Sequence, residues 1–89
     1  MTIEVIYPDG REETRKHVTF EQTKELVGGY VEIVTVRDAD GDLVQGCCNE
    51  DGRSMGLARN LKATARFAGK ILGDCVGVWV VLKGKDMLR

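Results

Sequence analysis

Hydrophobic and polar positions alternate in short runs through the first part of the chain, which indicates strands separated by turns. Residues 2–7 carry several β-branched side chains and predict a strand. Pro8, Asp9 and Gly10 predict a turn, because proline presets φ and glycine takes up conformations that other residues avoid. Residues 11–18 are mostly polar and predict a solvent-facing return strand, so the pattern indicates an N-terminal hairpin.

A short helix is predicted next. Thr19 and Gln22 have the spacing of a capping box, in which the threonine hydroxyl accepts a hydrogen bond from the Gln22 amide and the glutamine side chain reaches back. The helix should run through Val27 and end at Gly28 and Gly29, since glycine readily adopts the left-handed conformation of a helix C-cap. A helix this short depends on packing rather than on its own propensity.

A second hairpin is predicted from the next two runs. Residues 30–37, with the sequence YVEIVTVR, are the clearest strand in the chain, and residues 43–49 predict the strand that returns. Residues 38–42 between them resemble the start of a calcium-binding loop. Their glycine is fourth instead of sixth, however, and the twelfth position is Asn49 instead of glutamate. We therefore interpret this segment as a hairpin turn.

The main helix is predicted in the second half, over residues 57–72. With about 100° of rotation per residue, four apolar side chains fall on one narrow arc and form the expected buried stripe: Leu61, Ala65, Ala68 and Leu72. Residues 75–82 predict a final strand, which contains Trp79.

This order of elements predicts an α+β fold. We expect a small, mostly antiparallel sheet of two hairpins and a C-terminal strand, with a short and a long helix packed on one face. A single domain is expected over residues 1–84, followed by a tail over residues 85–89.

Charge is balanced overall but unevenly placed. The 89 residues carry 14 acidic and 13 basic side chains, for a formal net charge of −1. This balance disfavours a protein that coats nucleic acid. Residues 53–70 nevertheless hold five basic side chains and no acidic one, which predicts a local basic face. A domain of this size has a thin core, so we also expect a homo-oligomer.

Four basic side chains have the spacing to share one face of the predicted helix. Such a row either binds an anionic ligand or forms a solvated outer face. We call these residues the cationic row: Arg59, Lys62, Arg66 and Lys70.

The loop before the predicted helix favours an anion site. Gly52 and Gly56 allow close backbone approach, and a helix N-terminus presents free N–H groups to an anion. The loop lacks the spacing of a P-loop or of GxGxxG, so an ordinary loop and helix cap is the alternative. Asn60 lies one turn into the predicted helix, in a position to bond back to the loop. The predicted ligand-binding residues are Asn49, Gly52, Arg53, Gly56, Arg59, Asn60, Lys62 and Arg66.

Other chemistries find little support in the sequence. No arrangement combines a nucleophile, a base and an orienting group, so we expect no enzyme and no catalytic residue. A single histidine and the lack of a Cys-x-x-Cys motif disfavour a metal site, and no cofactor is predicted. We interpret Cys47, Cys48 and Cys75 as packed strand residues with reduced thiols. Phe67 and Tyr30 are candidates for exposure at an interface.

The sequence also predicts the compartment. Its opening segment is strand-like and lacks the basic and apolar regions of a signal peptide. The longest apolar run, residues 76–82, is far shorter than the roughly 20 residues of a membrane-spanning helix. We expect a cytoplasmic protein without a membrane partner.

Several short motifs occur together within residues 26–82, a segment of 57 of the 89 residues. They are Gly-Tyr-Val-Glu-Ile-Val at 29–34, Asn-Glu-Asp-Gly at 49–52, Gly-Leu at 56–57, Asn60 with Ala63 and Thr64, and Ile-Leu-Gly-Asp at 71–74, before the closing valine strand. In these motifs the chain resembles a family of small domains of unknown function from bacteriophage, plasmid and prokaryotic genomes. The resemblance implies a mobile-element protein that acts inside a bacterial cell, and it brings no activity or catalytic residues.

Three functions follow as hypotheses. The first is a non-enzymatic phage accessory protein that binds an anionic small ligand, such as a nucleotide or a nucleotide-derived signal, and so counters host defence or regulation. The second is a protein–protein interaction module that docks on a host protein, for which the acidic hairpins would serve as well as the basic helix. The third is a nucleic-acid-binding regulator, which the net charge of −1 disfavours.

Overall fold

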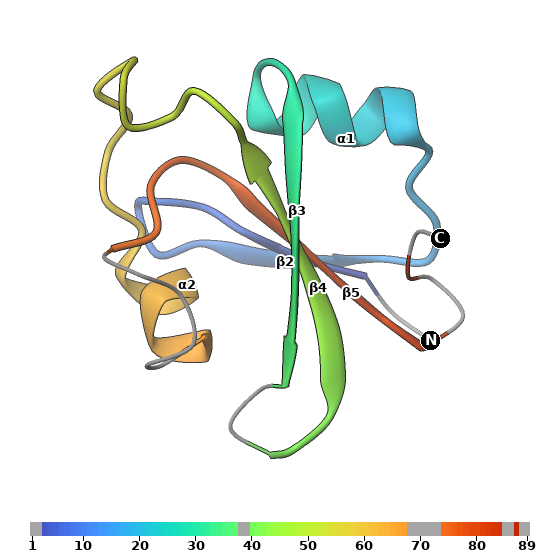
Figure 1. The fold of residues 1–89 in the computed structure, drawn as a ribbon. Helices are drawn as coiled ribbons and strands as arrows, with labels where there is room; N and C mark the ends of the chain where they lie inside the picture. Colours follow the sequence, from blue (N-terminus) through green and yellow to red (C-terminus); the bar gives the residue numbers. More distant parts are fainter. Residues whose placement is uncertain (1–2, 38–39, 68–73, 85–86, 88–89) are drawn as a thin grey trace.

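The fold belongs to the predicted α+β class. The computed structural model describes residues 3–37, 40–67, 74–84 and 87. Within these residues it has a five-stranded antiparallel sheet and two helices (Figure 1). The elements in chain order are β1 (Ile3–Ile6), β2 (Glu12–Arg15), α1 (Phe20–Val27), β3 (Val31–Arg37), β4 (Leu43–Asn49), α2 (Leu61–Arg66) and β5 (Trp79–Lys83).

The C-terminal strand joins two hairpins into one sheet. The strand order is β2-β1-β5-β4-β3, so β5 lies in the centre between β1 and β4. β1 pairs with β2, and β3 pairs with β4 over their full length. Figure 1 shows that the sheet is strongly twisted, so that β3 and β4 run across the direction of β1 and β2. The edge strands of this sheet are β2 and β3.

Both ends of α1 follow local sequence chemistry. The hydroxyl of Thr19 accepts a hydrogen bond from the Gln22 amide at 3.1 Å, and the Gln22 side chain accepts one from the Thr19 amide at 2.9 Å. Gly28 ends the helix with φ 81°, and its amide donates to the Lys24 carbonyl oxygen at 2.9 Å. The predicted capping box and glycine cap are therefore confirmed.

The helices cover opposite faces of the sheet, whereas the sequence predicted them on one face. Side chains alternate along a strand, so Val5 packs in the cluster that contains Val27 of α1, and Ile6 packs in the cluster that contains Ala63 of α2. The burial of the central strands explains why both faces of the sheet are covered. β5 is buried at four consecutive positions and β4 at six, so both of their faces need a covering layer.

The second helix begins later than predicted. Residues 57–60 are not helical, and α2 begins at Leu61 after its N-cap, Asn60. Arg59 forms an isolated β-bridge with Val76 instead. Asparagine favours the cap position because its side-chain oxygen accepts a hydrogen bond from an otherwise unpaired amide in the first turn. The predicted helical residues 68–72 lie outside the described residues.

The buried side of α2 also differs from the predicted stripe. Leu61 is 65% exposed and Ala65 is exposed, whereas Ala63 is fully buried. Phe67, which the sequence suggested for an interface, is buried against Trp79 with ring centroids 5.2 Å apart. A helix of six residues is oriented by what its ends contact, so the apolar spacing alone did not predict which side it buries.

Two smaller differences concern the C-terminal region. β5 begins at Trp79 instead of residue 75, so Cys75 precedes the strand. Met87, in the predicted tail, packs against the cluster on the α1 face. Within the described part of the chain, neither helix has the length and apolar character needed to cross a bilayer.

Candidate functional site

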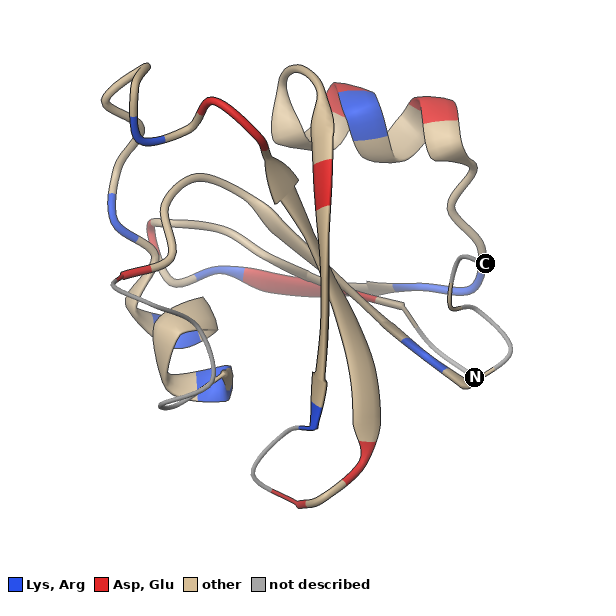
Figure 2. Ribbon diagram, viewed as in Figure 1, with Lys and Arg blue, Asp and Glu red and all other residues tan. Residues whose placement is uncertain are grey.

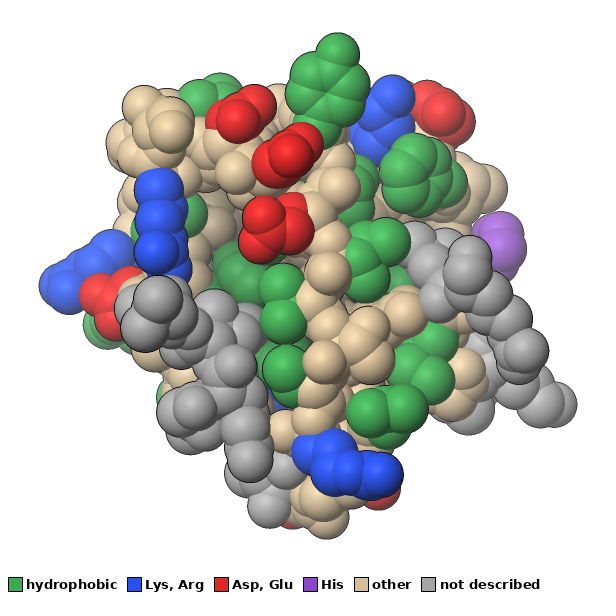
Figure 3. Space-filling model, in the orientation of Figure 1, with side chains coloured by type: hydrophobic (Ala, Val, Ile, Leu, Met, Phe, Trp, Pro, Cys, Tyr) green, Lys and Arg blue, Asp and Glu red, His purple; other side chains and the backbone are tan. Residues whose placement is uncertain are grey.

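A hollow opens on the α2 face of the sheet, beside the edge strand β3. Its cavity volume is about 330 Å³, near the lower end of the range for small-ligand pockets. Figure 3 shows this face, with apolar side chains in the hollow and acidic side chains gathered above it, over the upper ends of β3 and β4. We call it the β3 pocket, and its described lining residues are Glu32, Val34, Cys48, Asn49, Glu50, Arg53, Ser54, Asp74, Cys75, Val76 and Trp79.

Three segments that are distant in sequence build the β3 pocket. β3 supplies Glu32 and Val34, because alternate residues of a strand point to the same face. β4 ends at Asn49, and the loop after it supplies the rim from Glu50 to Ser54. The remaining side is formed by residues 74–76 and by β5.

Acidic side chains dominate the rim. The described lining residues include three carboxylates and one guanidinium, which gives a formal charge of −2. Asp74 is paired, since its Oδ2 atom lies 3.2 Å from Nη1 of Arg59. Glu32 and Glu50 form no ion pair with another described residue. Within the described residues, no positive charge is therefore paired with either carboxylate.

The guanidinium in the lining also has an internal partner. Nη2 of Arg53 donates a hydrogen bond to the backbone carbonyl oxygen of Asp74 at 3.1 Å. This bond joins the loop after β4 to the segment before β5, across the pocket wall. Arg53 therefore links two parts of the pocket lining, and its charge offsets part of the acidic rim.

The cationic row does not form as predicted. Nζ of Lys62 lies 3.3 Å from Oε2 of Glu12, and Arg66 makes two hydrogen bonds with Glu4, at 3.1 and 3.2 Å. Both basic residues of α2 therefore have carboxylate partners on the β1–β2 hairpin. Figure 2 shows the two basic positions along the α2 ribbon. Lys70 lies outside the described residues.

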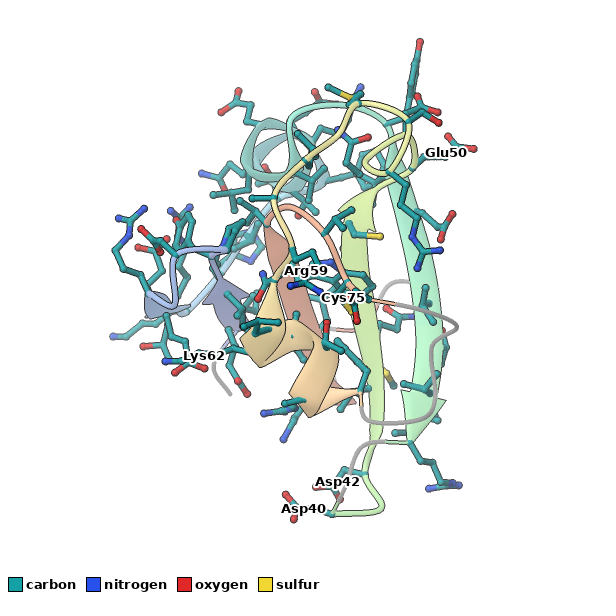
Figure 4. The ribbon with its side chains drawn as sticks, turned by 90° about the vertical axis from the view of Figure 1, so that its left-hand side faces the viewer. Asp40, Asp42, Glu50, Arg59, Lys62 and Cys75 are labelled. Carbon is teal, nitrogen blue, oxygen red and sulfur yellow. The ribbon has the colours of Figure 1, made fainter. Side chains whose placement is uncertain are left out.

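The predicted basic residues are also spread over different parts of the surface. Arg59 precedes α2 and pairs with Asp74, so it does not share a helix face with Lys62. Figure 4 shows Lys62 beside the β1–β2 hairpin and Glu50 on the opposite side of the view, above the ends of β3 and β4. The described part of the row is thus divided among three separate ion pairs instead of forming one anion-binding surface.

The loop glycines are engaged in local turns. The Gly52 amide donates to the Asn49 carbonyl oxygen at 3.1 Å, and the Gly56 amide donates to the Arg53 carbonyl oxygen at 3.1 Å. The predicted role of these two amides as anion donors is therefore not supported by the geometry. A Cβ atom at Gly52 would lie 3.1 Å from Cγ2 of Val76, so a larger residue there would require this side chain to shift.

The two predicted asparagines hold the fold around the pocket. Nδ2 of Asn49 donates to the Val27 carbonyl oxygen at 3.1 Å, and its Oδ1 accepts from the Asp51 amide at 2.8 Å. Asn60 is fully buried and bonds to β1 and to the segment before β5, not to the loop. Asn49 lines the β3 pocket, whereas Asn60 is absent from its described lining.

The three cysteines are packed thiols, as the sequence predicts. Cys47, Cys48 and Cys75 are all free and buried. Burial raises the pKa of the Cys47 thiol to about 11. Burial, with a further contribution from the negative charge of Glu32, raises the pKa of Cys48 to about 12. A thiol with so high a pKa is a poor nucleophile at neutral pH.

We expect the native protein to react slowly with Ellman's reagent at pH 8. Both raised pKa values favour the neutral thiol, so only about one Cys47 in 1,000 would be a thiolate at this pH, and burial blocks access. The measurement is the absorbance of the released thionitrobenzoate, with and without urea. Rapid release of one equivalent without urea would contradict the assignment of these residues to the core.

Of the eleven described lining residues, the predicted ligand-binding set contained only Asn49 and Arg53. Sequence reasoning missed the other nine, which include Glu32, Glu50 and Asp74. One signal was present. Glu32, Val34 and Val36 are two positions apart and so share one face of the most apolar predicted strand. This spacing puts a carboxylate on an otherwise apolar face. Nothing in the sequence indicated that Asp74 would lie across the pocket from it.

Comparison of the chain with protein-family models, with curated proteins and with solved structures finds no match. The function must therefore be inferred from the chemistry of the pocket itself.

Among the described residues, no three His, Cys, Asp or Glu side chains are grouped so that they could hold a metal ion.

Proposed function

We propose that this protein is a non-enzymatic protein-interaction module whose β3 pocket receives a basic side chain of a partner protein. The observation that carries the proposal is the pair of rim carboxylates, Glu32 and Glu50, which have no ion-pair partner among the described residues. They stand above an apolar floor, a combination that suits a long side chain with a charged end.

An arginine side chain fits this lining best. Its stem is apolar, and its weakly hydrated, planar guanidinium can donate hydrogen bonds to two carboxylates. Val34, Val76 and the largely buried indole of Trp79 offer apolar contact below the rim. Arginine is also among the residues that contribute most to protein–protein interfaces.

The charge distribution favours this function over the anion-binding hypothesis. A nucleotide would bring phosphate groups to a pocket whose described lining has a formal charge of −2. A nucleic-acid backbone would meet the same repulsion, and the basic side chains of α2 are already paired with Glu4 and Glu12. We further propose that the partner is a bacterial host protein, an assignment that rests on the expected membership in a family of phage, plasmid and prokaryotic domains.

The direct test uses N-acetyl-arginine methylamide as the probe, titrated into the ¹⁵N-labelled protein and followed by NMR. We expect saturable shifts at Glu32, Glu50 and the Trp79 indole N–H, with affinity in the millimolar range because one side chain is offered. The lysine analogue should bind more weakly, since ammonium cannot form the planar double contact. N-acetyl-glutamate methylamide should cause no shift at these residues.

Two double variants distinguish the effect of the pocket carboxylates from the effect of the protein's overall charge. Glu32→Gln with Glu50→Gln should weaken the arginine probe by roughly tenfold. Glu21→Gln with Glu25→Gln removes the same charge from α1, on the other face of the sheet, and should leave binding unchanged. Equal loss in both variants, or shifts at the pocket produced by inorganic phosphate or AMP but not by the arginine probe, would overturn the proposal.

A further inference from the structure

The outer edge of β3 is an unusual surface for a small domain. Among the described strands, β3 pairs only with β4, so one side of its seven-residue backbone has no strand partner. Proteins commonly protect such edges with charges, proline or a short length. The other edge strand follows this rule, since β2 has four residues with the sequence EETR. β3 instead has the sequence VEIVTVR, and its Ile33 is 41% exposed.

One hydrogen bond shows which backbone groups point outward. The Glu50 amide donates to the Tyr30 carbonyl oxygen at 2.8 Å, in register with the β3–β4 ladder. Because hydrogen-bonded and non-hydrogen-bonded pairs alternate in an antiparallel ladder, the even residues of β3 bond to β4. The amides and carbonyls of Val31, Ile33 and Thr35 therefore point away from the sheet, toward the open edge.

We propose that the β3 edge pairs with the β3 edge of a second copy of this chain, in an antiparallel register centred on Val34. In this register the outward groups of Ile33 meet those of Thr35 in the second copy, and Val31 meets Arg37. The two sheets then continue across a twofold axis as one ten-stranded sheet. All seven residues of β3 take part, and no unpaired backbone group is left within the strand.

The sequence of β3 is suited to pairing with itself. In the centred register Val34 lies opposite Val34, and Glu32 lies opposite Val36, so no like charges face each other. Ile33 lies opposite Thr35 on the other face, and both are β-branched residues that favour strands. A twofold contact needs one surface that is complementary to itself, and this strand meets that condition.

The proposed dimer has a consequence for the β3 pocket, and only this consequence rests on the proposed function. A twofold axis perpendicular to the sheet keeps the same face of both copies on one side. Glu32 and Val34 line the pocket from β3, so the two pockets would lie side by side on that face. The dimer would then offer two basic side chains of a partner a pair of neighbouring sites, which raises the overall affinity.

Thr35→Pro tests the edge without cutting the ladder to β4. The Thr35 amide points outward, so proline removes a donor that only the second copy uses. Thr14→Pro is the matched control on β2. The Tyr7 amide donates to the Arg11 carbonyl oxygen at 2.9 Å, and the same alternation points the Thr14 amide outward at the opposite edge. Both threonines are exposed.

Sedimentation equilibrium of the intact chain, without any probe, measures the outcome. We expect a dimer for the wild type and for Thr14→Pro, and a dissociation constant raised by roughly a hundredfold for Thr35→Pro, which loses two symmetry-related hydrogen bonds. Ile33→Lys provides a second variant that keeps every backbone donor and places two lysines near the twofold axis. It should also shift the protein toward the monomer.

Several results would overturn the dimer. If the wild type were monomeric at millimolar concentration, the proposed dimer would be wrong, whether the β3 edge stays open or pairs with a strand of another protein. A dimer that survives both β3 variants with an intact circular dichroism spectrum, or one that Thr14→Pro dissociates instead, would also overturn the proposal. Because no arginine probe is present, failure here is distinguishable from failure of the proposed pocket function.

Discussion

Replacing Asn60 by alanine is expected to lower the free energy of unfolding by about 3–5 kcal/mol. The side chain is 0% exposed and makes three hydrogen bonds. Its Nδ2 donates to the carbonyl oxygens of Ile6 and Gly77, both at 2.9 Å, and its Oδ1 accepts from the Ala63 amide at 3.0 Å. Alanine would leave these three backbone groups without this partner in the core, and a buried unpaired polar group is costly.

The large expected effect follows from where these partners lie. Ile6 is in β1, Gly77 precedes β5, and Ala63 is in the first turn of α2. The backbone amide of Asn60 adds a further bond to the Cys75 carbonyl oxygen at 2.7 Å. One side chain therefore fixes the start of α2 to two separate segments of the α2 face, and its loss should loosen all of them together.

Urea denaturation followed by the fluorescence of Trp79, the single tryptophan, measures the change. Asn49→Ala is the matched control, since Asn49 is also buried but is 7% exposed and is the last residue of β4, and it should cost about 1–2 kcal/mol. Asn60→Asp keeps the acceptor for Ala63 but brings a buried carboxylate against two carbonyl oxygens. This variant should be least stable at neutral pH and recover in part at low pH, because a protonated carboxyl can donate one bond. A loss below about 1 kcal/mol for Asn60→Ala would contradict this role.

Features set by residues close together in sequence could be predicted. Thr19 and Gln22 are three positions apart, and their reciprocal hydrogen bonds are formed as the spacing predicts. Gly28 ends α1 because only its own backbone conformation is involved. The strand over residues 43–49 has its predicted bounds, and β3 starts one residue later than predicted. Capping and turn chemistry are local, so the chain carries the information within a few residues.

Features set by distant partners could not be predicted in the same way. Asn60 bonds to Ile6, and Arg66 pairs with Glu4, so the orientation of α2 depends on β1. The apolar periodicity applied to a longer helix considered on its own. It predicted that Leu61 is buried, whereas Leu61 is exposed in the structure. The cationic row was predicted without carboxylate partners because those partners are distant in sequence. They lie within the first 12 residues or at Asp74.

The continuous apolar run of β5 did contain usable information. Trp79, Val80, Val81 and Leu82 are consecutive and all buried, which is the pattern of a strand covered on both faces. Applied strictly, this pattern argues against placing both helices on one face of the sheet. It also identifies a central strand, and β5 is the strand that links the two hairpins.

Gly46→Ala is expected to destabilise the protein by about 3 kcal/mol, at the upper end of the usual cost of overpacking a core. Gly46 lies in β4 under the two large rings of the α2 face. A Cβ atom at this position would lie 2.6 Å from Cζ3 of Trp79 and 2.8 Å from Cζ of Phe67. These distances are well inside van der Waals contact, so the rings would have to separate from their tilted packing at 5.2 Å between centroids.

Gly29→Ala separates this steric effect from the change in backbone entropy. Neither Gly46 nor Gly29 has a positive φ, so alanine is compatible with the backbone at both positions. The nearest atom to a Cβ at Gly29 is Nδ2 of Asn49 at 3.0 Å. The Asn49 amide would shift slightly against its bond to the Val27 carbonyl oxygen, and we expect a loss of about 1 kcal/mol. Urea denaturation gives both free energies, and the near-ultraviolet circular dichroism of Trp79 should change only for Gly46→Ala. If the two variants were equally stable, the close packing of β4 against Phe67 and Trp79 would be wrong, and so would the apolar floor of the β3 pocket that Trp79 helps to form.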